Sequence, residues 1–191
     1  MSDLVANRGH KEIRDVRIHH IEMIAIEPIT VNNAMVFRAV RLQALQDAPS
    51  AFGSTYAREI QFTDGEWIKR TMLWNGERGI GFLATDGNVT CGLAGSFLDA
   101  ENARKAHLLS MWTAPSHRQR GVGRLLVNAV ISWAYQRGAR RLQLMVTSNN
   151  QSAISFYQRL GFTLTGQTEP YANDSSVCEY EMSRLLSSEN C

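Results

Sequence analysis

The amino-acid sequence predicts one α/β (α+β) domain in which helices flank a mixed β-sheet. A chain of 191 residues suits a single compact domain and can bury a core without disulfides or metals. Segments with strand-like and helix-like hydrophobic periods follow one another in the order β-α-α-β-β-β-α-β-α-β-β. We therefore expect residues 21–186 to form the domain, preceded by a flexible N-terminal segment at residues 1–20.

The first half of the chain predicts four strands and two helices. A pair of asparagines at 32–33 can cap the first helix. Asp86-Gly87-Asn88 separates two β-rich runs, which is a strong hairpin signal. The expected elements are a strand at 21–30, helices at 32–47 and 64–74, and strands at 79–85, 89–98 and 106–113.

The second half contains the clearest helix of the sequence. Seven apolar residues recur at helical spacing and would form one buried stripe, and Gly138 would end the helix. The stripe consists of Val122, Leu125, Leu126, Ala129, Val130, Trp133 and Ala134. After it we expect a strand at 142–146, a helix that Ser148 or Asn149 caps and Gly161 ends, and closing strands at 162–168 and 177–184.

Composition argues for a globular protein of the reducing cytoplasm. Hydrophobic residues make up 44% and charged residues 20% of the chain, and no apolar run approaches the roughly 20 residues that cross a bilayer. The first twenty residues are polar and lack the apolar core of a secretory signal. Cys91, Cys178 and Cys191 match neither a zinc spacing nor a disulfide framework. We expect no membrane partner and no metal.

Charge is distributed unevenly along the chain. Residues 102–168 contain nine Lys or Arg and no acidic residue, although the whole chain carries only +2. This block favours an anionic ligand, with a solvated basic surface as the alternative. Few aromatic residues are interleaved with the arginines and no nucleic-acid-reading motif is present, so a nucleic-acid partner is not expected.

A glycine-containing turn, residues 118–124, precedes the long helix inside this basic block. Gly121 and Gly123 allow unusual backbone angles and close approach of a ligand, while the first turn of a helix offers free N–H groups. The turn would therefore suit a phosphate, with Arg118, Arg120 and Arg124 beside it. It lacks the Gly-Lys-Ser/Thr ending of ATP-type loops and the acidic residue of dinucleotide sites. Taken alone, the pattern leaves phosphate binding and a simple tight turn equally open.

Two motifs together resemble the GNAT superfamily of N-acetyltransferases. Arg118, Gly121 and Gly123 match its Arg/Gln-x-x-Gly-x-Gly/Ala signature. The run from Asn150 to Phe162, with Ala153, Phe156-Tyr157 and Leu160-Gly161-Phe162, is similar to its second motif. The resemblance covers about residues 79–184. It implies that residues 21–186 are an N-acetyltransferase domain with a mostly antiparallel sheet of six to seven strands, splayed between the strands at 106–113 and 141–147.

The resemblance also implies acetyl-CoA as co-substrate and an amine as acceptor, attacked directly in a ternary complex. The pyrophosphate would lie on the glycine turn and the pantetheine arm along the strand before it. The residues expected to bind the coenzyme are Met111, Trp112, Thr113, Arg118, Gln119, Arg120, Gly121, Val122, Gly123, Arg124, Asn150 and Tyr157. Homodimers are common in the family, so a homodimer is expected as one outcome.

Tyr157 is the one residue to which we assign a catalytic role, as the acid that protonates the departing thiolate. A phenol near pKa 10 can protonate a thiolate whose conjugate acid lies near 8.5. No base is assigned, because the strand at 106–113 carries no carboxylate. Candidates for the base are Glu59, Glu101, Glu169, His107, Ser110 or a water chain. The alternative function is a non-catalytic acyl-CoA-binding or regulatory module.

Overall fold

The computed structural model describes residues 24–188, and the segment expected at residues 1–20 lies outside them. Together with three short 3-10 helices, five α-helices and seven strands build the described part. They are β1 (Ala25–Pro28), α1 (Ala34–Asp47), α2 (Tyr56–Glu59), α3 (Asp64–Met72), β2 (Gly79–Asp86), β3 (Val89–Leu98), β4 (Lys105–Thr113), α4 (Val122–Gln136), β5 (Arg141–Thr147), α5 (Gln151–Arg159), β6 (Thr163–Tyr171) and β7 (Asp174–Leu185). Within this part, no helix is long and apolar enough to cross a membrane.

The strands form one seven-stranded sheet in the order β1-β2-β3-β4-β5-β7-β6. Every neighbouring pair is antiparallel except β4 and β5, which are parallel. This confirms the predicted mixed, mostly antiparallel sheet. The hairpin predicted at Asp86-Gly87-Asn88 joins β2 to β3, and Gly87 has a φ of 57° there.

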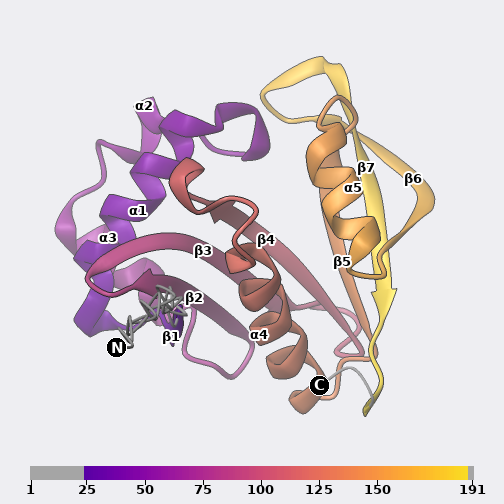
Figure 1. The fold of residues 1–191 in the computed structure, drawn as a ribbon, viewed down its shortest axis with the longest axis horizontal. Helices are drawn as coiled ribbons and strands as arrows, with labels where there is room; N and C mark the ends of the chain where they lie inside the picture. Colours follow the sequence, from indigo (N-terminus) through magenta and orange to yellow (C-terminus); the bar gives the residue numbers. More distant parts are fainter. Residues whose placement is uncertain (1–23, 189–191) are drawn as a thin grey trace, which may run out of the picture.

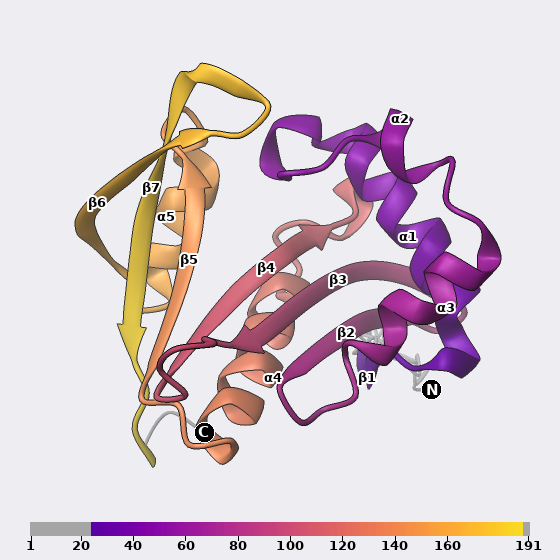
Figure 2. The same cartoon turned by 180° about the vertical axis from the view of Figure 1, so that it is seen from behind.

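The splay between β4 and β5 is the feature that positions the site. The two strands pair only over residues 105–107 of β4 and 141–143 of β5. Beyond these residues they diverge, so the molecule has two arms that join at one end and separate at the other (Figures 1 and 2). One arm contains β1–β4 with α1–α4, and the other contains β5–β7 with α5.

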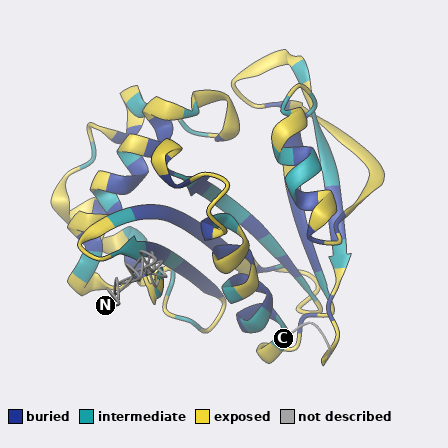
Figure 3. Ribbon diagram, in the orientation of Figure 1, coloured by how far each residue is buried: buried dark blue, intermediate teal, exposed yellow. Residues whose placement is uncertain are grey.

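The core lies between the sheet and the long helix α4. Six of the seven residues in its predicted apolar stripe are buried or partly buried, and Leu125 is the exception with 40% of its surface exposed. Figure 3 shows buried residues along the central strands and exposed residues on the outer sides of the helices. Apolar residues of β2, β3 and β4 pack against this helix, which explains why its period could be recognised in the sequence.

One short helix was not predicted from the sequence, and one helix cap was predicted wrongly. The missed helix is α2, a single turn that Thr55 caps by accepting a hydrogen bond from the Arg58 amide. Helix α5 is capped by Asn150, whose side chain accepts from the Ala153 amide at 3.1 Å, and not by Ser148 or Asn149. Any of these three residues can cap a helix, so sequence alone could not choose among them.

Candidate functional site

A cleft of about 740 Å³ occupies the space where β4 and β5 diverge. Its lining comes from both arms: β4 and β5, the loop 51–54, α2, the start of α5, and Glu179 of β7. Successive residues of a strand point their side chains to opposite faces of the sheet. Consecutive residues of β5 line the cleft, so the cleft passes through the sheet. Leu144 and Val146 therefore lie on one face of the sheet, and Thr147 and Glu179 lie on the other, and all four line the cleft. One molecule can thus enter from each face.

A bulge in β4 shapes one wall of the cleft. Three steps along β4 oppose two along β3, and Ser110 has a φ of 54°, an uncommon left-handed conformation for a residue other than glycine. The bulge turns Met111 toward α4, where it lies close to Gly123. The edge of β4 beyond His107 does not pair with β5, so its backbone polar groups face the cleft.

The glycine turn has the backbone geometry of an anion site. Gln119 and Gly121 both have positive φ angles, 62° and 86°. No side chain caps α4, and the first helical hydrogen bond runs from the Leu125 amide to the Gly121 carbonyl. Within residues 24–188 the amides of residues 122–124 therefore have no acceptor. Such amides at a helix start bind anions.

The two glycines of this turn serve different needs. Gly121 has open space where a side chain would be, and its φ of 86° is what requires glycine. At Gly123 a Cβ would lie 3.0 Å from Phe156 Cζ and 3.2 Å from Met111 Cε. Gly123 thus allows close packing of α4 against α5 and β4, a requirement that the sequence did not reveal.

The arginines of the turn differ in how they are held. Arg118 donates from Nε to the Thr113 carbonyl at 3.1 Å and forms an ion pair with Asp47. Arg120 lies 3.6 Å from Asp86. Arg124 is exposed and lines a second cavity between α4 and the end of α5. Arg118 therefore holds the end of β4, and Arg124 lines the second cavity and not the first cleft.

Trp112 also contributes to the framework. Its side chain is 4% exposed, and its Nε1 donates to Asp47 Oδ2 at 2.8 Å. Asp47 thereby ties the end of α1 to both Trp112 and Arg118.

Helix α5 brings the two remaining predicted residues into the cleft. Asn150 uses its Oδ1 as the helix cap, which leaves its amide nitrogen without a partner among the described residues. Tyr157 is 7% exposed, lines the cleft, and donates no hydrogen bond to any residue of 24–188. Burial raises the pKa of the Tyr157 phenol above its usual value, so the hydroxyl is protonated at neutral pH.

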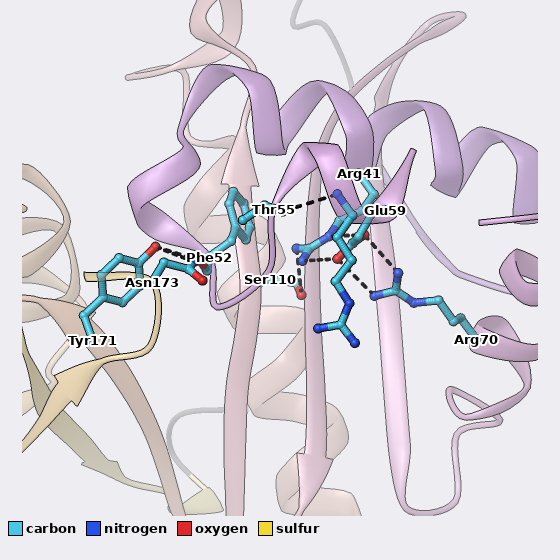
Figure 4. A network of polar contacts seen from close by, with 9 residues as sticks. Arg41, Phe52, Thr55, Glu59, Arg70, Ser110, Tyr171 and Asn173 are labelled. Carbon is cyan, nitrogen blue, oxygen red and sulfur yellow. Dashed lines mark hydrogen bonds and ion pairs between the residues drawn. The ribbon is translucent and has the colours of Figure 1, made fainter. Parts of the chain in front are cut away.

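Opposite β5, a buried ion-pair cluster forms the α1–α3 wall (Figure 4). Arg41 donates to both carboxylate oxygens of Glu59 at 3.0 and 3.1 Å, and Arg70 donates to the same carboxylate at 2.9 Å. Arg41 also reaches Ser110 Oγ at 3.3 Å. Burial of Glu59 would raise its pKa, but the hydrogen bonds and charges of Arg41 and Arg70 outweigh burial and lower it. Glu59 thus stays ionised and its oxygens are occupied.

The other candidates for the base differ in whether they line the cleft. Glu101 and Glu169 are exposed and do not line the cleft. His107 lines it and its Nε2 lies 2.9 Å from Asp99 Oδ2. Sequence reasoning missed Glu179, a half-buried carboxylate that does line the cleft. Burial and the charge of Glu169 raise the pKa of Glu179.

Comparisons with known proteins agree with this architecture. The model of the acetyltransferase (GNAT) family matches residues 42–162. Streptothricin acetyltransferase from Streptomyces lavendulae is 37% identical over 84 residues, which cover 44% of this chain and 43% of that protein. The chain spans less than half the length of this protein and of two other curated relatives that it matches.

Solved structures share the whole fold. An acetyltransferase of the GNAT family from Streptococcus pneumoniae superposes with a TM-score of 0.71 at 24% identity, covering 86% of this chain and 99% of that one. PaiA N-acetyltransferase from Thermoplasma acidophilum, solved in complex with coenzyme A, gives a TM-score of 0.68 at 14% identity, covering 85% and 98%. At these identities the likeness establishes the fold.

Proposed function

We propose that this chain, which belongs to the acetyltransferase (GNAT) family, transfers an acetyl group from acetyl-CoA to an amine. One observation carries the proposal: the cleft between β4 and β5 passes through the sheet, so a thioester and an amine can meet from opposite faces. Holding two reactants together in this way removes much of the entropic cost of their encounter. The similarity to streptothricin acetyltransferase supports the same chemistry.

The glycine turn, whose Gly123 lies next to the cleft-lining Met111, fits a coenzyme that carries a pyrophosphate. The free amides of residues 122–124 and the left-handed turn at Gln119 and Gly121 would hold its negative charge. The unpaired edge of β4 at residues 111–113 would pair with the pantetheine arm, and the Asn150 amide would donate to it. Acetyl-CoA, when bound, supplies the acetyl thioester. Backbone N–H groups beside the β4 bulge would stabilise negative charge on the thioester oxygen.

Tyr157 would supply the proton that the departing thiolate needs. Burial raises the pKa of its phenol, so the hydroxyl is protonated at neutral pH. The same shift makes the phenol a weaker acid, so the role requires the thiolate to form within hydrogen-bond distance of the hydroxyl. The incoming nitrogen must in turn lose a proton, because an ammonium has no lone pair for attack. Glu59 is unsuited to accept that proton, since both its oxygens are bound by arginines.

The proposal also covers the cellular compartment, the metal dependence and the oligomeric state of the enzyme. Cys91 and Cys178 are both free thiols, which suits the reducing cytoplasm that we infer. We propose a reaction without a metal ion and a homodimer as the assembly to test by sedimentation.

Calorimetric titration with acetyl-CoA and an assay of thiol release over an amine panel test the proposal. We expect micromolar binding, and release of free thiol with at least one amine. Tyr157→Phe should lower kcat by about 10²-fold or more with little change in acetyl-CoA affinity. Gly121→Val should instead weaken acetyl-CoA binding, because valine disfavours a φ of 86°. Binding without turnover of any amine would favour the non-catalytic module, and absence of binding at millimolar acetyl-CoA would refute both.

A further inference from the structure

The two walls of the cleft carry opposite charge. The α1–α3 wall presents three guanidinium groups, Arg41, Arg58 and Arg70, against the single carboxylate of Glu59. The β5–β7 wall presents the carboxylate of Glu179. A ligand that fits both walls must carry a negative group at one end and a positive group at the other.

On the α1–α3 wall, Arg58 has no partner while its neighbours are fixed. Arg58 is exposed, lines the cleft, and makes no side-chain hydrogen bond or ion pair with any residue of 24–188. Arg70 is held by Glu59 and lies over the rings of Trp67 and Phe62, at 4.9 and 5.3 Å from their centroids. Because Glu59 balances only one of the three cations, the wall keeps a net positive charge that can bind an anion.

On the β5–β7 wall, two polar groups lie next to each other without a partner. Thr147 and Glu179 are directly opposite in the β5–β7 pairing, so their side chains share one face. Thr147 Oγ1 is fully buried and unbonded within residues 24–188, and Thr147 lines the cleft. No Lys or Arg of the described chain pairs with Glu179. This wall therefore suits an ammonium group, which donates hydrogen bonds and carries positive charge.

A hydrogen-bonded bridge joins the two arms at the end where they diverge. The Tyr171 hydroxyl donates to the Phe52 carbonyl at 2.8 Å, and Asn173 Nδ2 donates to the same carbonyl at 2.8 Å. Figure 4 shows Tyr171 and Asn173 reaching across to the loop that carries Phe52. This bridge joins the two arms above the cleft. The bridge restricts access from this end of the cleft, so an acceptor would enter from a face of the sheet.

We infer that the acceptor is a small amine that also bears an anionic group, a carboxylate or a phosphate, with Arg58 and Arg70 binding the anion and Glu179 facing the amine. An α-amino acid has this combination of charges. The inference rests on the proposed acetyl transfer and narrows its acceptor. It differs from a polycationic acceptor, which the three arginines would repel.

Matched acceptors test the inference. Thiol release would be measured with acetyl-CoA and the standard amino acids, their carboxamides, ethanolamine, O-phosphoethanolamine and spermidine. We expect kcat/KM at least tenfold higher for an amino acid than for its own carboxamide. If the anion is a phosphate, O-phosphoethanolamine will exceed ethanolamine by the same margin.

An arginine variant then locates the anion. Arg58→Ala should bring the acid-to-amide ratio of kcat/KM toward one, and its exposure means that folding should survive. Arg137→Ala is the control, because Arg137 is exposed and lines neither cavity, and it should keep the ratio of the wild type.

The failures can be told apart. If acetyl-CoA does not bind, the proposed function itself is wrong. If acetyl-CoA binds but the carboxamides or spermidine are turned over as well as or better than the anionic amines, or no anionic amine is turned over, the acceptor class is wrong. An unchanged ratio in Arg58→Ala would refute the role of Arg58.

Discussion

Glu59 and Glu179 lie on opposite walls of one cleft, and their carboxyl groups are perturbed in opposite directions. Glu59 is 1% exposed, and yet its pKa is lowered, because Arg41 and Arg70 bind both of its oxygens. Glu179 is only half-buried, and yet its pKa is raised, because burial acts together with the nearby charge of Glu169. The number and sign of the neighbours decide the direction more than the depth of burial.

This difference separates a structural carboxylate from one available to a ligand. The Glu59 carboxylate joins α2 to α1 and α3 and, through Arg41, to the bulge at Ser110. The Glu179 carboxylate makes no ion pair within the described chain and lies beside an unbonded Thr147 hydroxyl. On the first wall the carboxylate oxygens are already occupied by arginines, whereas on the second wall the Glu179 carboxylate and the Thr147 hydroxyl are left for the acceptor.

The strongest test of the comparison is Glu59→Gln. Without the carboxylate, the 5%-exposed Arg41 becomes a buried charge with no counter-ion, so we expect a loss of about 3–5 kcal/mol in the free energy of unfolding. Urea denaturation at pH 7 measures it. Glu101→Gln, at an exposed carboxylate outside the cleft, should change stability by less than about 0.5 kcal/mol.

The stability difference between wild type and Glu59→Gln should also depend on pH, in a direction that the pKa of Glu59 sets. Because the folded pKa of Glu59 is lowered, its contribution is present above the unfolded pKa, near 4.5, and is lost as the pH falls through the folded value. The stability gap between wild type and Glu59→Gln should therefore narrow in acid. A loss below 1 kcal/mol at pH 7 would mean that Arg41 is well solvated and would contradict the structural role.

Glu59 and Glu179 also show which parts of the site could be predicted from the sequence and which could not. The period of α4, the Asp86-Gly87-Asn88 hairpin and the run from Asn150 to Phe162 are local patterns, and they predicted the fold and the place of Tyr157. Glu59 could be named as a candidate base, but its arginines come from two other helices, and no local pattern records that contact.

Other parts of the site lacked any local signal. Ser110 adopts a left-handed conformation that usually indicates glycine, so the bulge of β4 was not visible in the sequence. Glu179 lies in a strand with exposed polar neighbours, and only the pairing of β7 with β5 brings it to the cleft. The splay came from the family resemblance, since hydrophobic period does not record where two strands separate.

Glu179→Gln tests the other wall. If an ionised Glu179 attracts the amine, kcat/KM should fall about tenfold at neutral pH, and the acid limb of the pH profile should disappear. The pKa of Glu179 is raised, so in the wild type that limb should lie above pH 4.5. Glu169 on β6 lies directly opposite it. The charged and titratable groups that line the same cleft are Arg41, Arg58, Glu59, Arg70, His107 and Tyr157.

Glu181→Gln is the matched control for that variant. Glu181 is two residues along the same strand, pairs with Met145, and does not line the cleft. Its kcat/KM and pH profile should match the wild type. If Glu179→Gln kept the wild-type acid limb, another group would be responsible for it, and His107, which also lines the cleft, would be the next to change.

Glu169→Gln should have the smallest effect, because it changes a neighbour of Glu179 and leaves Glu179 itself unchanged. Glu169 is directly opposite Glu179 in the β6–β7 pairing, and its charge helps to raise the pKa of Glu179. Neutralising Glu169 should lower that pKa and move the acid limb of kcat/KM to lower pH, while the maximal rate stays close to the wild type. Because like charges opposite each other destabilise a sheet, unfolding at pH 7 should also cost a few tenths of a kcal/mol more. A limb that stays in place would show that burial alone raises the pKa of Glu179, and that the two walls differ by solvation and not by their charged neighbours.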